Sequence, residues 1–264
     1  MIISASRRTD IPAFYSKWFI DKIRKGFFVR INPYNPKDQK RISLKSKDVE
    51  CFVFWTKNPE NFIPCLDELD QAEYHYYFQY TLNHYPDCFE PKLPSYKKRI
   101  NTFKNLSSKI GKDRMVLRYD PIIISNLTPF TYHLQKIEKL MNDLKDDANH
   151  LVFSFIHFYE KTKKHLNYLK NGYDLKFLDI YDKKNSEFLE RFLRSLKELS
   201  EKYGLEISSC AQIDKISRII SSRACIDGDL IQKITGLNQH FKRDRGQREN
   251  CLCVKSVDMG AYQS

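Results

Sequence analysis

The chain has 264 residues, of which 41% are hydrophobic, 14% aromatic and 30% charged. That composition supplies enough apolar material for a buried core and excludes a largely disordered chain. The amino terminus lacks the apolar run of a signal peptide, and no stretch of about 18 apolar residues occurs anywhere. We therefore expect neither secretion nor a membrane span.

Charge and cysteine content indicate the partners and the compartment. The 45 Lys and Arg residues against 33 Asp and Glu leave a formal charge of +12, which would attract a nucleic acid or an anionic small molecule. The alternative is that the lysines only solvate helix faces. Seven cysteines, an odd number in a chain too large to need disulfides, favour the reducing cytoplasm.

Short apolar runs alternate with longer amphipathic segments, which is typical of βα units around a largely parallel sheet. The expected strands are residues 2–6, 27–32, 51–56, 74–81, 114–119, 151–158 and 205–210. The expected helices are residues 13–25, 61–69, 95–110, 132–144 and 186–203. Such a sheet can close or stay open, and we expect an α/β fold of the TIM-barrel type.

The end of the chain differs in composition from the rest. After Gly236 the sequence becomes polar and basic through residues 240–248, and it then reaches Cys251 and Cys253. No Pro/Gly/Ser-rich linker divides the chain. We therefore expect a barrel domain over residues 1–236 and a short basic, cysteine-containing tail over residues 237–264 that packs on it.

Reactive groups of α/β folds collect where the parallel strands end, so polar residues at those positions are the candidates for catalysis. These residues are Arg7, Arg8, Asp10, Arg118 and Asp120. Adjacent arginines suit a carboxylate or phosphate ligand, and Arg118 and Asp120 share one face of their strand. The alternative reading is that Arg7–Asp10 and Arg118–Asp120 are structural ion pairs.

Two further strand ends predict substrate contacts. Trp55, Lys57 and Asn58 present an aromatic ring, a cation and an amide just before a helix, and Gln79 and Thr81 share a face of the next strand. A small ligand could stack and hydrogen-bond there. The alternative is a buried Trp55 with Lys57 reaching outward to solvent.

The cysteines fall into two groups. Cys51, Cys65 and Cys88 are isolated and behave as packing residues. The four metal-ligand candidates are Cys210, Cys225, Cys251 and Cys253. Four thiolates can hold zinc or an iron–sulfur cluster, although the C-x-C spacing is not the C-x₂-C pattern typical of such sites. The sequence contains no Gly-rich phosphate loop, G-x-S-x-G elbow or H-E-x-x-H, which disfavours hydrolases and kinases.

Motifs spread along the whole chain resemble those of one family, DUF1848, a domain of unknown function. They are ISASRRTDIPAFYS, FVFWTKNP, YYFQYTLN, RYDPI, SCA, ACIDG and NCLCVKSVDMGAYQS, which together run from residue 2 to residue 264. The resemblance implies a relationship to radical S-adenosylmethionine barrels, and with it an iron–sulfur cluster and S-adenosylmethionine as cofactors.

One departure from the family pattern bears on this expectation. In the family, the segment resembling residues 258–262 is followed by a C-x₃-C-x₂-C cluster, and the sequence printed here reaches Ser264 where that cluster would begin. The chain is then either truncated or a short member whose chemistry is altered or lost.

Three functions thus remain open at this stage. The first is a radical S-adenosylmethionine-like enzyme of unknown substrate. The second is a nucleic-acid-binding protein that uses its basic surface, including the stretch from Lys242 to Arg248. The third is a zinc-stabilised domain without catalysis.

Overall fold

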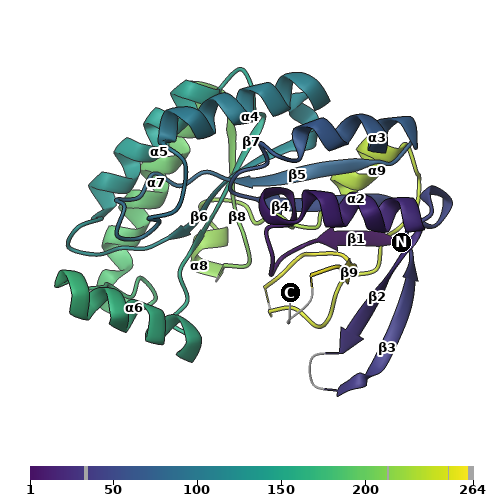
Figure 1. The fold of residues 1–264 in the computed structure, drawn as a ribbon. Helices are drawn as coiled ribbons and strands as arrows, with labels where there is room; N and C mark the ends of the chain where they lie inside the picture. Colours follow the sequence, from purple (N-terminus) through teal and green to yellow (C-terminus); the bar gives the residue numbers. More distant parts are fainter. Residues whose placement is uncertain (33–34, 213, 249, 261–264) are drawn as a thin grey trace.

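The computed structural model describes residues 1–32, 35–212, 214–248 and 250–260, and its main element is a seven-stranded parallel sheet (Figure 1). The strand order is β8-β7-β6-β5-β4-β1-β9. The strands are β1 (Ile2–Ala5), β4 (Cys51–Thr56), β5 (Tyr76–Thr81), β6 (Met115–Ile122), β7 (His150–Phe155), β8 (Glu206–Ser209) and β9 (Val257–Asp258). Within the described ranges no pairing joins β8 to β9, so the expected closed barrel is not observed and the sheet is open.

Helices flank this sheet. They are α1 (Ile11–Phe14), α2 (Ser16–Lys25), α3 (Leu66–Gln71), α4 (Tyr96–Ile110), α5 (Phe130–Leu144), α6 (Glu160–Tyr173), α7 (Ser186–Tyr203), α8 (Asp214–Ser217) and α9 (Gly228–Thr235), with single 3₁₀ turns η1 (Ser46–Asp48), η2 (Ile63–Cys65), η3 (Lys112–Arg114) and η4 (Lys183–Asn185). None of the helices in the described ranges has the length and apolarity needed to cross a bilayer.

The second expected strand is not part of the main sheet. Residues 27–32 form β2 (Phe27–Asn32), which pairs antiparallel with β3 (Asn35–Ser43) in a separate hairpin that projects from the body (Figure 1). Phe28 and Ile42 are buried at its base, whereas Val29 and Ile31 further along are exposed. The prediction that residues 27–32 join the main sheet was wrong. These residues pair instead with β3, a strand rich in charged residues, and no core covers the outer part of the hairpin.

The alternation of side chains along the strands gives the sheet two apolar faces. One face packs against helices α2, α3, α4, α5 and α7 through a large aromatic-rich core that includes Phe19, Phe54 and Phe103. The other face, which we call the inner face, carries Val53, Tyr77 and other side chains. There the covering layer is the C-terminal segment, residues 210–254, and each large apolar side chain buried contributes about 1.5–3 kcal/mol.

The end of the C-terminal segment is tied to the first strand. Strand β9 pairs with β1, and the Met259 N–H donates to the Ser4 carbonyl at 2.8 Å. The Asp258 carboxylate accepts hydrogen bonds from the Ser4 hydroxyl at 3.3 Å and the Arg7 N–H at 3.0 Å. Gly260 then lies so close to Ser6 that an added Cβ would come within 2.1 Å of the Ser6 Oγ. Only glycine fits this approach.

We expect the substitution Gly260→Ala to loosen the contact between β9 and β1 and to destabilise the fold by about 1–3 kcal/mol, the usual cost of overpacking. Urea unfolding measures the change. The control is Gly246→Ala, because an added Cβ there meets its nearest atom, the Asp244 Oδ1, at 3.4 Å. Equal stabilities of the two variants would contradict the close packing of Gly260.

The buried histidine His133 of α5 should make the stability of the fold sensitive to acid. Its Nδ1 accepts from the Tyr119 hydroxyl at 2.9 Å and its Nε2 donates to the Ile123 carbonyl at 3.0 Å. Burial lowers the pKa of His133 to about 4, below the value of 6.5 expected in the unfolded chain. The unfolded state therefore binds the proton more readily, and stability present above pH 6.5 is lost as the pH falls toward about 4.

The resulting loss of stability amounts to roughly 3 kcal/mol at most. We expect His133→Gln to reduce the slope of unfolding free energy against pH between these limits, measured by denaturant titration. His75→Gln, at an exposed histidine, should leave that dependence unchanged. A slope in His133→Gln that equals that of the parent protein would assign the acid sensitivity to other groups.

Candidate functional site

Arg118 of β6 lies at the centre of the polar residues on the inner face. Only 2% of its surface is exposed. Its Nη1 donates to the Gln79 Oε1 and to the Cys225 Sγ, both at 3.1 Å, and its Nη2 donates to Asp120. The guanidinium also lies 5.3 Å from the centre of the Trp55 ring. Four predicted site residues are thus brought together around one buried cation.

Asp120 is the acid of this group. Its carboxylate accepts hydrogen bonds from Arg118 and from the Ser154 hydroxyl of β7, and 24% of the side chain remains exposed. Burial alone would raise the pKa of Asp120, but Arg118 and Ser154 outweigh it and hold that pKa below its ordinary value. Asp120 is therefore an ionised, partly accessible carboxylate near the carboxyl edge of the sheet.

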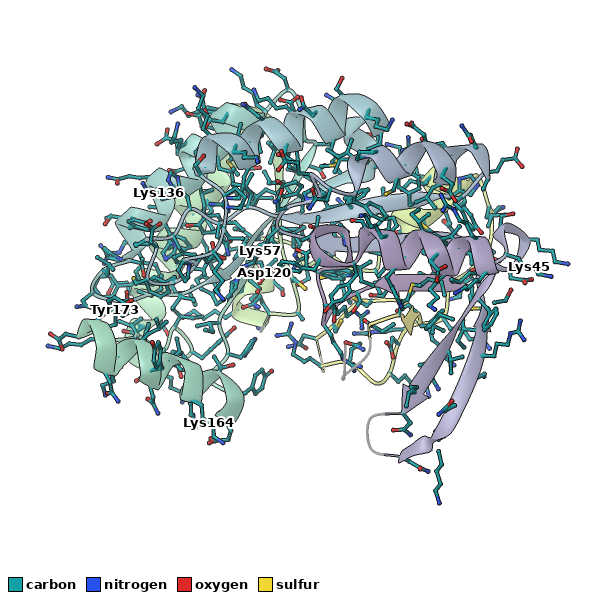
Figure 2. The ribbon with its side chains drawn as sticks, viewed as in Figure 1. Lys45, Lys57, Asp120, Lys136, Lys164 and Tyr173 are labelled. Atoms are coloured by element: carbon teal, nitrogen blue, oxygen red, sulfur yellow. The ribbon has the colours of Figure 1, made fainter. Side chains whose placement is uncertain are left out.

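A second ion pair lies beside this acid. Lys57, directly after β4, pairs with Glu90 from the loop after β5, and the Asn83 Nδ2 lies 3.5 Å from the same Glu90 oxygen (Figure 2, where Lys57 and Asp120 are labelled). The Asn83 side chain also binds the Asp120 backbone: its Oδ1 accepts from the Asp120 N–H at 2.9 Å, and its Nδ2 donates to the Asp120 carbonyl at 3.0 Å. The other Glu90 oxygen, Oε2, is buried and has no hydrogen-bond partner among the described residues.

The loop after β1 contributes a cation to the same edge. The Arg7 Nη2 is buried and has no hydrogen-bond partner in the described part of the chain. Asp10 has no ion pair with Arg7 in the described ranges; instead it caps α1 through the Ala13 N–H at 3.0 Å and accepts from the Lys57 N–H at 2.7 Å. Burial raises the pKa of Asp10, although these hydrogen bonds oppose that effect.

Arg8, the third charged residue predicted in this loop, points outward. The Arg8 N–H donates to the Ser6 hydroxyl at 3.1 Å, and the Arg8 side chain is exposed.

The four candidate cysteine ligands lie together next to Arg118. The Cys210 and Cys225 sulfurs are 2.8 Å apart, the Cys253 thiol contacts both Cys225 and Cys251, and all four residues are buried. The contact with Cys253 lowers the pKa of Cys251 to about 7. The contacts follow one another in a chain, and no three His, Cys, Asp or Glu side chains of the described ranges converge on a point that could hold a metal ion.

This arrangement bears on which metal group the thiols could hold. A cubane iron–sulfur cluster stands between its thiolates and keeps them a cluster's width apart. Here the neighbouring sulfurs touch. As they stand, the four cysteines do not fit an iron–sulfur cluster, and no reaction step is derived through one at this position.

The remaining predicted substrate contacts are less directly placed. Asn58 is held in a local turn, where its N–H donates to the Thr56 hydroxyl at 3.1 Å and its side-chain oxygen accepts from the Glu60 N–H at 3.4 Å. Thr81 lies opposite Arg118 in the register of β5 and β6. Trp55 is oriented by a hydrogen bond from its Nε1 to the Ser4 hydroxyl at 3.2 Å.

Sequence reasoning missed several polar residues at this edge. Glu90 lies in a long loop with no strand end to mark it, and Ser154 precedes the end of its strand. Asn83 could have been found, because it follows β5 by two residues. Gln212, just after β8, also lies here and accepts a hydrogen bond from the Tyr181 hydroxyl at 2.7 Å. The two residues are 31 positions apart in the sequence, so only the fold brings them together.

A polar cavity of about 710 Å³ lies elsewhere, toward the amino ends of β6, β7 and β8. It is lined by His150, Glu206 and Ser208 among others, and Arg223 closes one side by donating to the His150 Nδ1 at 2.7 Å. None of the predicted site residues lines it. It is therefore separate from the group around Arg118.

Comparisons with known proteins identify a family and a solved structure that aligns with much of the chain. A solved structure described as a "putative alpha-L-fucosidase" from Bacteroides thetaiotaomicron aligns with a TM-score of 0.34 and 9% sequence identity, over 90% of this chain and 84% of that one. No curated protein matches the chain. The family described as Domain of unknown function (DUF1848) matches residues 2–264. The chain therefore belongs to the DUF1848 family.

Proposed function

We propose that this protein is an enzyme of the radical S-adenosylmethionine type whose reaction site lies at the carboxyl edge of the parallel sheet. The observation that carries the proposal is the Arg118–Asp120 pair, in which a buried cation holds an accessible carboxylate ionised. Such a carboxylate can accept a proton or orient a donor group of a substrate. A purely structural pair would have no need of the exposed side of Asp120.

Two unsatisfied groups at the same edge indicate the kind of ligand. Arg7 offers a buried donor and Glu90 a buried acceptor, and leaving such groups without partners costs free energy. A small ligand with an anionic group for Arg7 and a donor group for Glu90 would satisfy both. This favours an anionic or zwitterionic small molecule over a nucleic acid.

The basic tail supports the same preference. Arg243 donates two hydrogen bonds to the Cys251 carbonyl, at 2.8 and 3.0 Å, so its side chain helps to hold the C-terminal segment in place. Arg248 interacts electrostatically with Asp120 and with Cys210. In the stretch expected to follow phosphates of a nucleic acid, one cation is thus bonded to the chain's own backbone, and another interacts with Asp120 and Cys210.

The family resemblance supplies the radical chemistry of the proposal. A bound iron–sulfur cluster with S-adenosylmethionine would generate the radical that abstracts hydrogen from the substrate. The cysteines for it would follow β9, as in the family pattern, and Asp258 at the end of β9 is bonded to Ser4 and Arg7 at the carboxyl end of β1. A segment that continues from β9 therefore starts at the proposed reaction edge. The free thiols of the chain suit the reducing cytoplasm as its compartment.

The test uses the natural gene product, purified and reconstituted with iron and sulfide without oxygen. We expect stoichiometric iron and sulfide and reductive cleavage of S-adenosylmethionine to 5′-deoxyadenosine, measured by chromatography. Asp120→Asn should keep the cluster spectrum but lower substrate-dependent turnover by about 10²-fold or more, the usual effect of losing an acid–base group. The control is Asp113→Asn at an exposed ion pair. A natural gene product that binds neither iron nor S-adenosylmethionine would refute the proposal.

A stability measurement separates the roles of the two charges. Arg118→Met leaves Asp120 without its cation and should cost about 3–5 kcal/mol, the usual cost of breaking a buried pair from one side. Asp120→Asn keeps a hydrogen-bond acceptor for Arg118 and should cost less. Denaturant unfolding compares the two variants. If Asp120→Asn is as destabilising as Arg118→Met, the pair is structural and Asp120 is not the acid of a reaction site.

A further inference from the structure

We propose that Cys210, Cys225, Cys251 and Cys253 bind a single zinc ion in tetrahedral geometry, which clamps the C-terminal segment to the inner face of the sheet. The inference goes beyond the proposed function and does not depend on it, because it concerns a structural ion rather than the radical reaction. Four thiolates are a ligand set typical of structural zinc.

The fold brings these thiols together from separate parts of the chain. Cys210 follows strand β8, Cys225 precedes α9, and Cys251 and Cys253 lie after the basic stretch. All four belong to the apolar cluster of the inner face. Between α9 and β9 the chain has no helix or strand in its described ranges, so a metal crosslink would supply stability that regular structure does not.

In the described structure the thiols do not converge on one point, so binding a single ion requires their sulfurs to move. With Zn–S bonds of about 2.3 Å, a tetrahedral site separates its sulfurs by about 3.8 Å. The Cys210 and Cys225 sulfurs, 2.8 Å apart, would have to separate by roughly 1 Å. A cubane cluster would require a larger displacement of the same sulfurs.

Hydrogen-bond donors face two of the four sulfurs. Arg118 donates to the Cys225 sulfur at 3.1 Å, and the Ile226 N–H donates to the Cys253 sulfur at 3.3 Å. Such outer hydrogen bonds orient metal ligands and stabilise their charge. A tetrathiolate zinc site carries a net double negative charge, and Arg118 and Arg248 are the cations that face it.

The close approach of Cys210 and Cys225 also permits a different product, a disulfide between them. That bond needs an oxidant, which a reducing cytoplasm does not supply. A disulfide would join only two of the four cysteines and would not explain why Cys253 contacts both Cys225 and Cys251. The zinc site accounts for all four.

The test measures metal in the protein itself. The chain purified under reducing conditions should contain one zinc ion per chain, and Cys225→Ser and Cys253→Ser should each lose it. The matched control is Cys51→Ser, because Cys51 is buried in the same apolar cluster but contacts none of the four thiols in the described structure. It should retain zinc at the level of the parent protein.

Two readouts keep the test independent of folding defects in the variants. In the parent protein, chelation of zinc should expose four further thiols to a thiol reagent, and replacement by cobalt should give the visible spectrum of a tetrahedral tetrathiolate. The proposal is overturned if the parent chain holds no zinc, if it holds iron with inorganic sulfide on these cysteines, or if mass spectrometry finds Cys210 and Cys225 joined in a disulfide.

Discussion

The buried guanidinium of Arg118 is the constraint on which the centre of the molecule depends. An arginine with 2% exposure must have its donors satisfied and its charge balanced, since an unpaired buried charge is costly. Its partners come from β5, from β6 and from the C-terminal segment, through Gln79, Asp120 and Cys225. One side chain therefore joins the sheet to its covering layer and also sets the ionisation of the acid at the sheet edge.

The C-terminal segment explains why the sheet stays open. In a closed (βα)₈ barrel, the inward side chains of the strands pack against one another. Here Val53 and Tyr77 pack instead in one cluster with Ile226 and Ile231, and the Tyr77 hydroxyl donates to the Cys225 carbonyl at 2.8 Å. Because the segment fills the space that opposing strands would need, β8 and β9 remain the two edges, and the carboxyl ends of the strands between them are lined by polar residues.

The parts of the structure that could be predicted are those with a clear local pattern. The strand from Cys51 to Thr56 and the helix from Ser186 to Tyr203 agree with the sequence prediction to the residue, because a continuous apolar run marks the strand and a helical period with a terminal glycine marks the helix. The hairpin was misassigned because a single apolar run does not reveal its partner. Glu90 was missed because its role comes from a contact with Lys57 across 33 residues of sequence, which no local pattern encodes.

The cysteine cluster and the polar edge meet at the same cation, which couples them. Arg118 donates to Asp120 with one nitrogen and to the Cys225 sulfur with another. Negative charge on the sulfurs would therefore offset part of the positive potential that Arg118 exerts on the Asp120 carboxylate. Neutral thiols would leave the effect of Arg118 on Asp120 nearly unchanged, whereas the negative charge of a tetrathiolate metal site would weaken it. Arg248, which interacts with both Asp120 and Cys210, supplies a second positive charge that opposes this weakening. Arg248 of the tail thus has a defined place in the charge balance of the inner face, where it helps to keep Asp120 ionised.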